Sequence, residues 1–204
     1  MKTLLLTLTL SSSVFFGFRN PSETPAFMDF LMEYVDLKYP TQQFESFVYV
    51  GIQRQKLYYI EKNKVLAEYT VSTSKHGFGN VANSFRTPDG LHTIFEKIGD
   101  NQPMGTIFTN RVSTGKIADI EKKPISSGRD EITSRIITLI GEEPGINKGG
   151  SVDSYARCIY IHGTPEEGLL GQPASHGCIR MSNEDVIDFY GKIKPGTKVL
   201  ILNN

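Results

Sequence analysis

The spacing of hydrophobic residues changes along the chain and divides it into three parts. An apolar run from Leu4 to Phe18, diluted by Thr and Ser, follows a single lysine. Between residues 27 and 39 the apolar positions recur at a mostly helical spacing, which predicts a short amphipathic helix that stops at Pro40. From Ser46 onward, runs rich in Val, Ile, Tyr and Phe alternate with short polar breaks, as is typical of strands.

Residues 46–204 are therefore expected to form one mainly β domain with a few short helices. The run "EITSRIITLIG" is compatible with strand or helix, and its β-branched residues favour strand. One late helix is predicted, with Ser182 as its N-cap and Asp185 at the capping-box position. Residues 100–128 are expected to be mostly loop. The predicted strands are three within 47–74, then 90–99, 106–108, 131–141, 157–163 and 197–202.

The N-terminal part differs from the rest in composition. Residues 1–18 have the pattern of a secretory signal peptide, and they are too short and too polar for a membrane-spanning helix, which needs about 20 apolar residues. An N-terminal anchor or a buried strand is the alternative. Residues 19–45 are interpreted as two parts: a linker up to residue 26, followed by the short helix. We therefore expect an exported protein.

Composition narrows the function classes. The 204 residues are 39% hydrophobic, which is enough for the core of one domain. The 22 basic residues are balanced by 22 acidic ones and form no basic run, which argues against a nucleic-acid partner. With two cysteines in the chain, a multi-cysteine zinc site is not expected.

Four candidate metal ligands lie near one another in the sequence: Cys158, His162, His176 and Cys178. On a strand, Cys158 and His162 would be about 13 Å apart, too far for one zinc ion, so no metal is expected. A disulfide between Cys158 and Cys178 stays open from the residues alone. Cys158 by itself is interpreted as a small buried hydrophobic residue.

The stretch "PASHGCIRMS" (173–182) suggests instead that Cys178 is a nucleophile. A free thiol with a pKa of about 8.5 is only slightly ionised at pH 7, and a nearby imidazole can take its proton. Gly177 permits a sharp turn, so the N–H groups of Gly177 and Cys178 are candidates to face a developing oxyanion. His162 ends a predicted strand, just before Gly163, where a side chain can be held rigidly.

The same residues carry a resemblance. "IHGT" followed by "SHGCIRMSNEDV" resembles the L,D-transpeptidase catalytic domain of the YkuD family, whose motif is a histidine, a spacer and then Ser/Thr-His-Gly-Cys. The spacer here, between His162 and Ser175, is 12 residues long, somewhat shorter than in many members. "QKLYYIEKNKVLAEYTVSTS" is similar to the family's opening hairpin, and "RTPDGLHTI" to a following element. The resemblance covers most of residues 46–204.

The resemblance implies a β-sandwich-like YkuD-type fold and an enzyme acting on peptidoglycan stem peptides in a bacterial periplasm or cell envelope. Cys178 would attack the carbonyl between the third residue and D-Ala, giving a thioester. His162 would be the base, oriented by the Gly163 carbonyl. His176 would shape the pocket, although proximity in sequence alone would have made it the base. Ser175 and Gly177 complete the motif around the thiol.

Two further residues are candidates for binding substrate. Arg180 could bind a carboxylate through its guanidinium, or form a structural ion pair. His92 could line the cleft, or be a surface histidine with no role in binding. The resemblance implies that the enzyme needs no cofactor and that carbapenem-type β-lactams inhibit it. We expect the protein to be a monomer.

The fate of the thioester is not fixed by the motif. An amine from a second stem would give a crosslink between third residues, whereas water would give L,D-carboxypeptidase activity. The loop-rich stretch 100–150 is a candidate lid that excludes water, which favours transpeptidation. A noncatalytic peptidoglycan-binding module is the alternative from another class.

Overall fold

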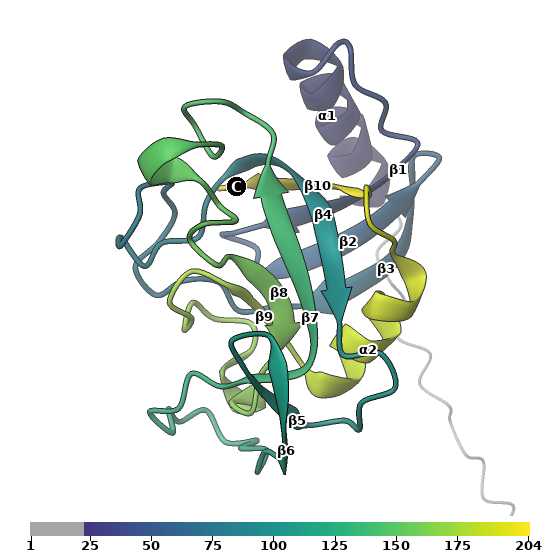
Figure 1. Ribbon diagram of the computed structural model, residues 1–204. Helices are drawn as coiled ribbons and strands as arrows, with labels where there is room; N and C mark the ends of the chain where they lie inside the picture. Colours follow the sequence, from purple (N-terminus) through teal and green to yellow (C-terminus); the bar gives the residue numbers. More distant parts are fainter. Residues whose placement is uncertain (1–22) are drawn as a thin grey trace, which may run out of the picture. The chain divides into compact units, whose positions relative to one another are not determined.

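The computed structural model describes the chain from Glu23 to Asn204 (Figure 1). The signal peptide or anchor predicted at 1–18 lies outside the described residues. The chain forms two units, which divide between Pro40 and Thr41. Among the described residues, no helix is long and apolar enough to cross a membrane.

Helix α1 (Glu23–Lys38) belongs to the first unit. The predicted helix is present and includes residues 23–26, which were predicted as linker, while residues 19–22 lie outside the described residues. Pro25 falls in the first turn of α1. In that turn the main-chain N–H groups have no partner within the helix, so a proline costs nothing there.

The second unit is built on one mixed sheet, in the order β3-β2-β1-β10-β4-β7-β5-β6, with β8 beside β7 and β9 beside β8. The pairs β1–β10 and β8–β9 are parallel and the others antiparallel. This arrangement confirms the mainly β prediction. The strands are β1 (Ser46–Gly51), β2 (Lys56–Glu61), β3 (Lys64–Thr70), β4 (Gly90–Ile98), β5 (Thr106–Thr109), β6 (Val112–Ile117), β7 (Ile132–Gly141), β8 (Tyr160–Gly163), β9 (Ile179–Met181) and β10 (Lys198–Leu202).

The sheet curls until its two ends meet around one core. Ser72, just after β3, and Arg180 in β9 exchange two main-chain hydrogen bonds of 2.9 Å each. Side chains from both halves of the sheet then pack together, for example Val48 and Val50 against Ile137 and Ile161. Helix α2 (Asn183–Lys192) contributes Val186, Phe189 and Tyr190 to this core.

Local signals explain most of these elements. Ser182 caps α2 as predicted, its hydroxyl accepting from the Asp185 N–H at 3.0 Å. Strand β6 was not predicted, because it is an edge strand with mostly exposed residues and lacks a hydrophobic period. Strand β8 is shorter than the predicted 157–163, because Cys158 adopts a left-handed conformation with φ of 57° and turns the chain.

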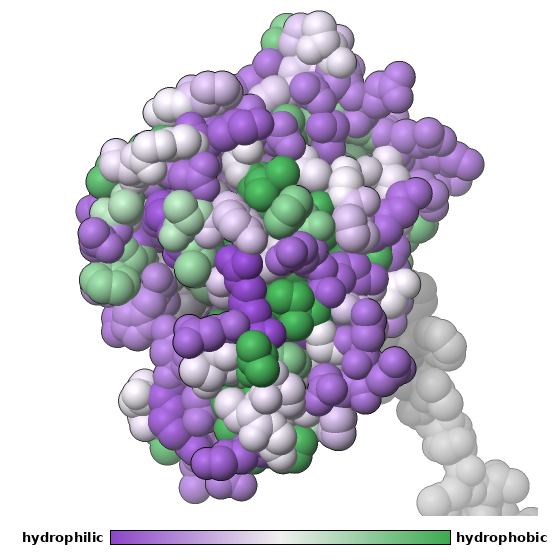
Figure 2. Space-filling model, in the orientation of Figure 1, coloured by the Kyte–Doolittle hydropathy of each residue, from purple (hydrophilic) through white to green (hydrophobic). Residues whose placement is uncertain are grey.

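Outside the sheet, two short 3₁₀ helices, η1 (Gly150–Val152) and η2 (Glu167–Leu169), interrupt the loops on either side of β8. On the face drawn in Figure 2, hydrophobic side chains form small separate groups among polar ones rather than one broad patch.

Candidate active site

Cys178 is the residue directly before β9. Strand β9 pairs with β8, which contains His162. Strands β8 and β9 are parallel, with Ile161 opposite Ile179 and His162 opposite Arg180. Because side chains alternate between faces, Cys178, His162 and Arg180 share one face, while Ile161 and Ile179 point into the core on the other. The fold therefore places the motif cysteine and the distant histidine on the same face of neighbouring strands.

The Cys178 thiol is half-buried and packs against Phe108, Ile136 and Tyr160. Its Sγ accepts a hydrogen bond from the Tyr160 N–H at 3.4 Å and donates to the Cys158 carbonyl at 3.3 Å. Burial raises the pKa of this thiol to about 12, and the Tyr160 N–H, which favours the thiolate, only partly offsets the increase. The thiol is protonated at neutral pH, so its attack on a carbonyl requires a base.

His162 is the candidate for that base. It is 1% exposed, and its Nδ1 lies 2.8 Å from the Gly163 carbonyl. Since a carbonyl can only accept, Nδ1 carries the hydrogen, and Nε2 has no hydrogen-bond partner among the described residues. Burial lowers the pKa of His162 to about 4, against the opposing effects of Gly163 and Asp130. At neutral pH the imidazole is uncharged, with a free lone pair.

Ser175 and Gly177 hold the turn that presents the thiol. The Ser175 hydroxyl donates to the Cys178 carbonyl at 2.6 Å and accepts from the Gly177 N–H at 3.1 Å. Gly177 has φ of 127°, and a Cβ there would lie 3.3 Å from the Arg86 carbonyl. The expectation that the Gly177 N–H faces an oxyanion is corrected, because Ser175 already uses this N–H. Gly177 shapes the turn instead.

Asp130 connects His176 to Arg180. Its carboxylate lies 2.7 Å from His176 Nδ1 and forms an ion pair with Arg180. Arg180 is 2% exposed and also pairs with Glu166 at 3.0 Å. Burial opposes ionisation of Asp130, but the Arg180 charge and the hydrogen bonds from Arg180 and His176 hold the pKa of Asp130 below its ordinary value. Arg180 therefore has the contacts of the structural ion pair that we considered beside substrate binding.

Two carboxylates hold the β6–β7 loop (118–131) against the site. Asp130 belongs to the loop and pairs with Arg180, and Glu166, outside the loop, binds loop residues. Glu166 accepts from the Ser127 N–H at 2.6 Å and from the Ser126 hydroxyl at 3.0 Å. A Cβ on Gly168 would lie 2.0 Å from the Lys123 carbonyl, so the loop main chain packs directly on this glycine. The stretch 100–150 contains the two predicted strands, β5 and β7, and also β6, with loops between them. The part without regular structure that reaches the motif residues is the β6–β7 loop.

His92 lies away from this face. It is completely buried in β4, with Nδ1 3.1 Å from the Gly90 carbonyl and Nε2 2.9 Å from the Ser154 hydroxyl. Neither the substrate contact nor the surface position considered for His92 fits this burial. Both ring nitrogens are used within the protein, and none remains for a ligand.

Both cysteines are free thiols. Cys158 is exposed rather than buried, which corrects the interpretation of it as a small buried hydrophobic residue. The turn at Cys158 also removes the strand geometry that we used to argue against zinc. Within the described part of the chain, no cluster of three or more His, Cys, Asp or Glu side chains could hold a metal ion.

Comparison with known proteins decides the family. A protein-family model described as the L,D-transpeptidase catalytic domain, YkuD, matches residues 45–201. The chain belongs to this L,D-transpeptidase family. The match covers all ten strands except the end of β10, and it includes Cys178 and His162.

Curated relatives in the family are distant. The chain is 25% identical over 157 residues to the probable L,D-transpeptidase YcfS of Escherichia coli (strain K12), covering 76% of this chain and 43% of that protein. It is 46% identical over 48 residues to the putative L,D-transpeptidase YqjB of Bacillus subtilis (strain 168), covering 24% of this chain and 27% of that protein. The chain thus spans less than half the length of these two relatives.

Solved structures of L,D-transpeptidases are also similar. An L,D-transpeptidase from Mycobacterium smegmatis has a TM-score of 0.49 at 17% identity, covering 78% of this chain and 58% of that one. A structure of LD transpeptidase LdtMt1 in complex with imipenem has a TM-score of 0.48 at 16% identity, covering 78% and 59%.

Sequence reasoning covered Asp130 only as part of the stretch 100–150, the candidate lid, and it did not single out Glu166. No motif marks either residue, because both act through contacts between segments far apart in sequence. The tripeptide "RDE" (129–131) before the strand does not indicate that Asp130 contacts His176 and Arg180.

Proposed function

We propose that this chain is a cysteine-dependent L,D-transpeptidase that acts on peptidoglycan stem peptides through a Cys178 thioester. One observation carries the proposal: the Cys178 thiol and a buried imidazole with a free Nε2 share one face of neighbouring strands. Such a pair can transfer the thiol proton as the sulfur attacks, without forming an isolated thiolate first.

In the proposed reaction, His162 Nε2 accepts the Cys178 proton as Sγ bonds to the carbonyl between the third residue and D-Ala. The Cys178 N–H, which has no partner among the described residues, is the main-chain donor that we assign to the resulting oxyanion. Imidazolium then donates the proton to the departing D-Ala amine, and the stem is left as a thioester. An amine of a second stem attacks next and frees the thiol.

We favour transpeptidation over hydrolysis by the same thioester. The β6–β7 loop supports this choice, since Asp130 and Glu166 attach it to residues of the catalytic face. A loop held against the site can keep water from a reactive intermediate. L,D-carboxypeptidase activity is the alternative outcome of the same chemistry.

Two measurements test the proposal. Purified protein incubated with tetrapeptide muropeptides should give dimers crosslinked between third residues, and tripeptide monomers alone at high acceptor concentration would contradict transpeptidation. Treatment with a carbapenem should add one drug mass to the Cys178 peptide. The Cys178→Ala variant should lose both reactions, whereas Cys158→Ala should keep most of the activity. Full activity in Cys178→Ala would leave the noncatalytic envelope module as the alternative.

We also propose that the protein works in the periplasm or cell envelope, as a monomer and without a cofactor. The N-terminal mass of protein recovered from cells tests export, and an intact Met1 in a soluble cytoplasmic fraction would contradict it.

A further inference from the structure

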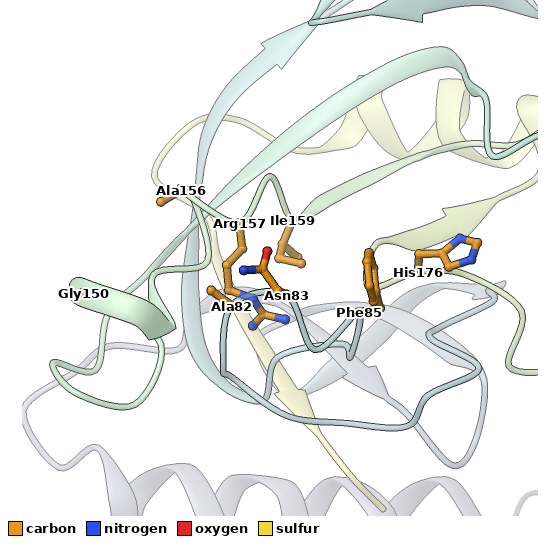
Figure 3. Close-up of a pocket in the computed structure, with 8 residues that line it drawn as sticks. All are labelled: Ala82, Asn83, Phe85, Gly150, Ala156, Arg157, Ile159 and His176. Atoms are coloured by element: carbon orange, nitrogen blue, oxygen red, sulfur yellow. The ribbon is translucent and has the colours of Figure 1, made fainter.

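A pocket with a volume of about 240 Å³ lies beside the nucleophile and takes no part in the steps above. In Figure 3, Arg157, Ile159 and Asn83 lie between Ala156 and Gly150 at one end and Phe85 and His176 at the other. Among the described residues, no carboxylate side chain lines the pocket. Apart from His176, Arg157 is the one titratable residue in its wall.

The Arg157 guanidinium is held in a fixed position by main-chain carbonyls. Nη1 donates to Gly79 at 3.2 Å and to Asn80 at 2.9 Å, and Nη2 donates to Arg86 at 2.6 Å. In the described part of the chain, Arg157 forms no ion pair with a carboxylate. Carbonyl dipoles fix the fork without neutralising its charge, so the pocket contains a preorganised cation. This differs from Arg180, whose charge is matched by Asp130 and Glu166.

The pocket wall is linked to the Cys178 thiol through neighbouring residues. Arg157 and Ile159 flank Cys158, whose carbonyl accepts the Cys178 hydrogen bond at 3.3 Å. On the other side of the thiol, a Cβ on Gly177 would lie 3.3 Å from Ile159 Cδ1. A group bound to Arg157 would therefore be part of the same peptide that Cys178 attacks.

We propose that the Arg157 pocket is a subsite for a carboxylate that the stem peptide carries close to its scissile bond. The inference rests on the proposed function and adds the chemistry by which the donor peptide is selected. Guanidinium and carboxylate form charge-assisted hydrogen bonds, and a pocket of this size holds a short side chain or one terminal residue. The family resemblance implies diaminopimelate as the usual third residue, which carries a carboxylate on its side chain. This carboxylate and the C-terminal one of D-Ala at position four are the two candidates.

The main experiment uses the unaltered protein and three tetrapeptide donors, so it does not depend on any variant folding. One donor has both carboxylates free, the second has the third-residue side chain amidated, and the third has the C-terminus amidated. The readout is kcat/KM for formation of the Cys178 acyl-enzyme, followed by mass spectrometry. We expect one of the two amides to react about 10- to 100-fold more slowly, the range for loss of a charge-assisted hydrogen bond, and the slow amide identifies the bound carboxylate.

A variant series ties the preference to Arg157. In Arg157→Gln the difference between the free donor and the slow amide should disappear, and in Arg157→Lys part of it should remain because the charge is kept. Lys62→Gln removes an exposed cation from the turn between β2 and β3 and should leave the preference unchanged.

The outcomes separate the two proposals. Equal rates for all three donors, or an unchanged preference in Arg157→Gln, would overturn the carboxylate subsite while the thioester mechanism stands. Failure of all three donors to acylate Cys178 would overturn the proposed function, and the subsite with it.

Discussion

Two histidines of this domain are alike in burial and pKa but differ in the hydrogen bonding of their Nε2 atoms. His92 in β4 and His162 in β8 are 0% and 1% exposed. In both, burial lowers the pKa to about 4, and in both Nδ1 lies against a main-chain carbonyl. They differ at Nε2. In His92 this atom is 2.9 Å from the Ser154 hydroxyl, whereas in His162 it has no partner among the described residues.

The comparison shows that neither burial nor a lowered pKa identifies a catalytic base. A buried histidine with two satisfied nitrogens is a structural element, because its hydrogen-bonding capacity is used to join β4 to the loop before β8. His162, by contrast, has one ring nitrogen whose hydrogen-bonding capacity is not used within the described part of the protein. We take that unused nitrogen as the mark of function.

The largest expected effect separates the two histidines directly. His162→Ala should lower the rate of carbapenem acylation at Cys178 by a factor of about 10² to 10⁴, the usual contribution of a positioned general base. His92→Ala should keep the acylation rate per folded molecule while lowering stability. Stopped-flow acylation and urea unfolding of both variants measure the two effects. The interpretation of the free Nε2 fails if His162→Ala acylates at the wild-type rate.

The next effect concerns Asp130, whose negative charge acts to raise the pKa of both His162 and Cys178. Asp130→Asn should slow acylation about tenfold, because Arg180 loses the negative charge of one of its two carboxylate partners and the His176 hydrogen bond is no longer charge-assisted. His176→Ala should also leave measurable acyl-enzyme. Lys123→Gln, in the same loop but directed to solvent, is the control and should behave as wild type. A loss in Asp130→Asn as large as that in His162→Ala would instead make Asp130 part of the reacting group.

The difference between the two histidines also marks what the sequence could predict. "IHGT" and "SHGC" predict His162 and Cys178 because the motif is contiguous at each end, and the alternation of β-branched residues predicts most strands. His92 has no such context, and its partner Ser154 lies 62 residues away, so its burial and pairing follow only from the curled sheet. From the sequence, Arg157 is interpreted only as a structural residue, for the same reason. Its three carbonyl partners lie more than 70 residues upstream.

A smaller effect tests the structural side of the comparison. Ser154→Ala removes the partner of His92 Nε2 and leaves a buried polar nitrogen unsatisfied, which costs on the order of 1–3 kcal/mol. Urea unfolding should show this loss, with the acylation rate per folded molecule unchanged. Ser151→Ala, at an exposed position nearby, should change stability by less than about 0.5 kcal/mol. An unchanged stability in Ser154→Ala would mean that His92 is satisfied in another way.

The smallest expected effect is the pH dependence of acylation by a carbapenem. The reactive form has His162 neutral and Cys178 protonated. With pKa values of about 4 and about 12, this form is the main one from about pH 5 upward through neutrality. His162 gains a proton only as the pH falls through about 4, so the rate should decrease below pH 5 and change less than about twofold between pH 5 and 8. Rates measured across this range test the neutral pair. A tenfold fall towards pH 5, with a midpoint near the ordinary histidine value of about 6.5, would assign the proton transfer to a solvated histidine in place of His162.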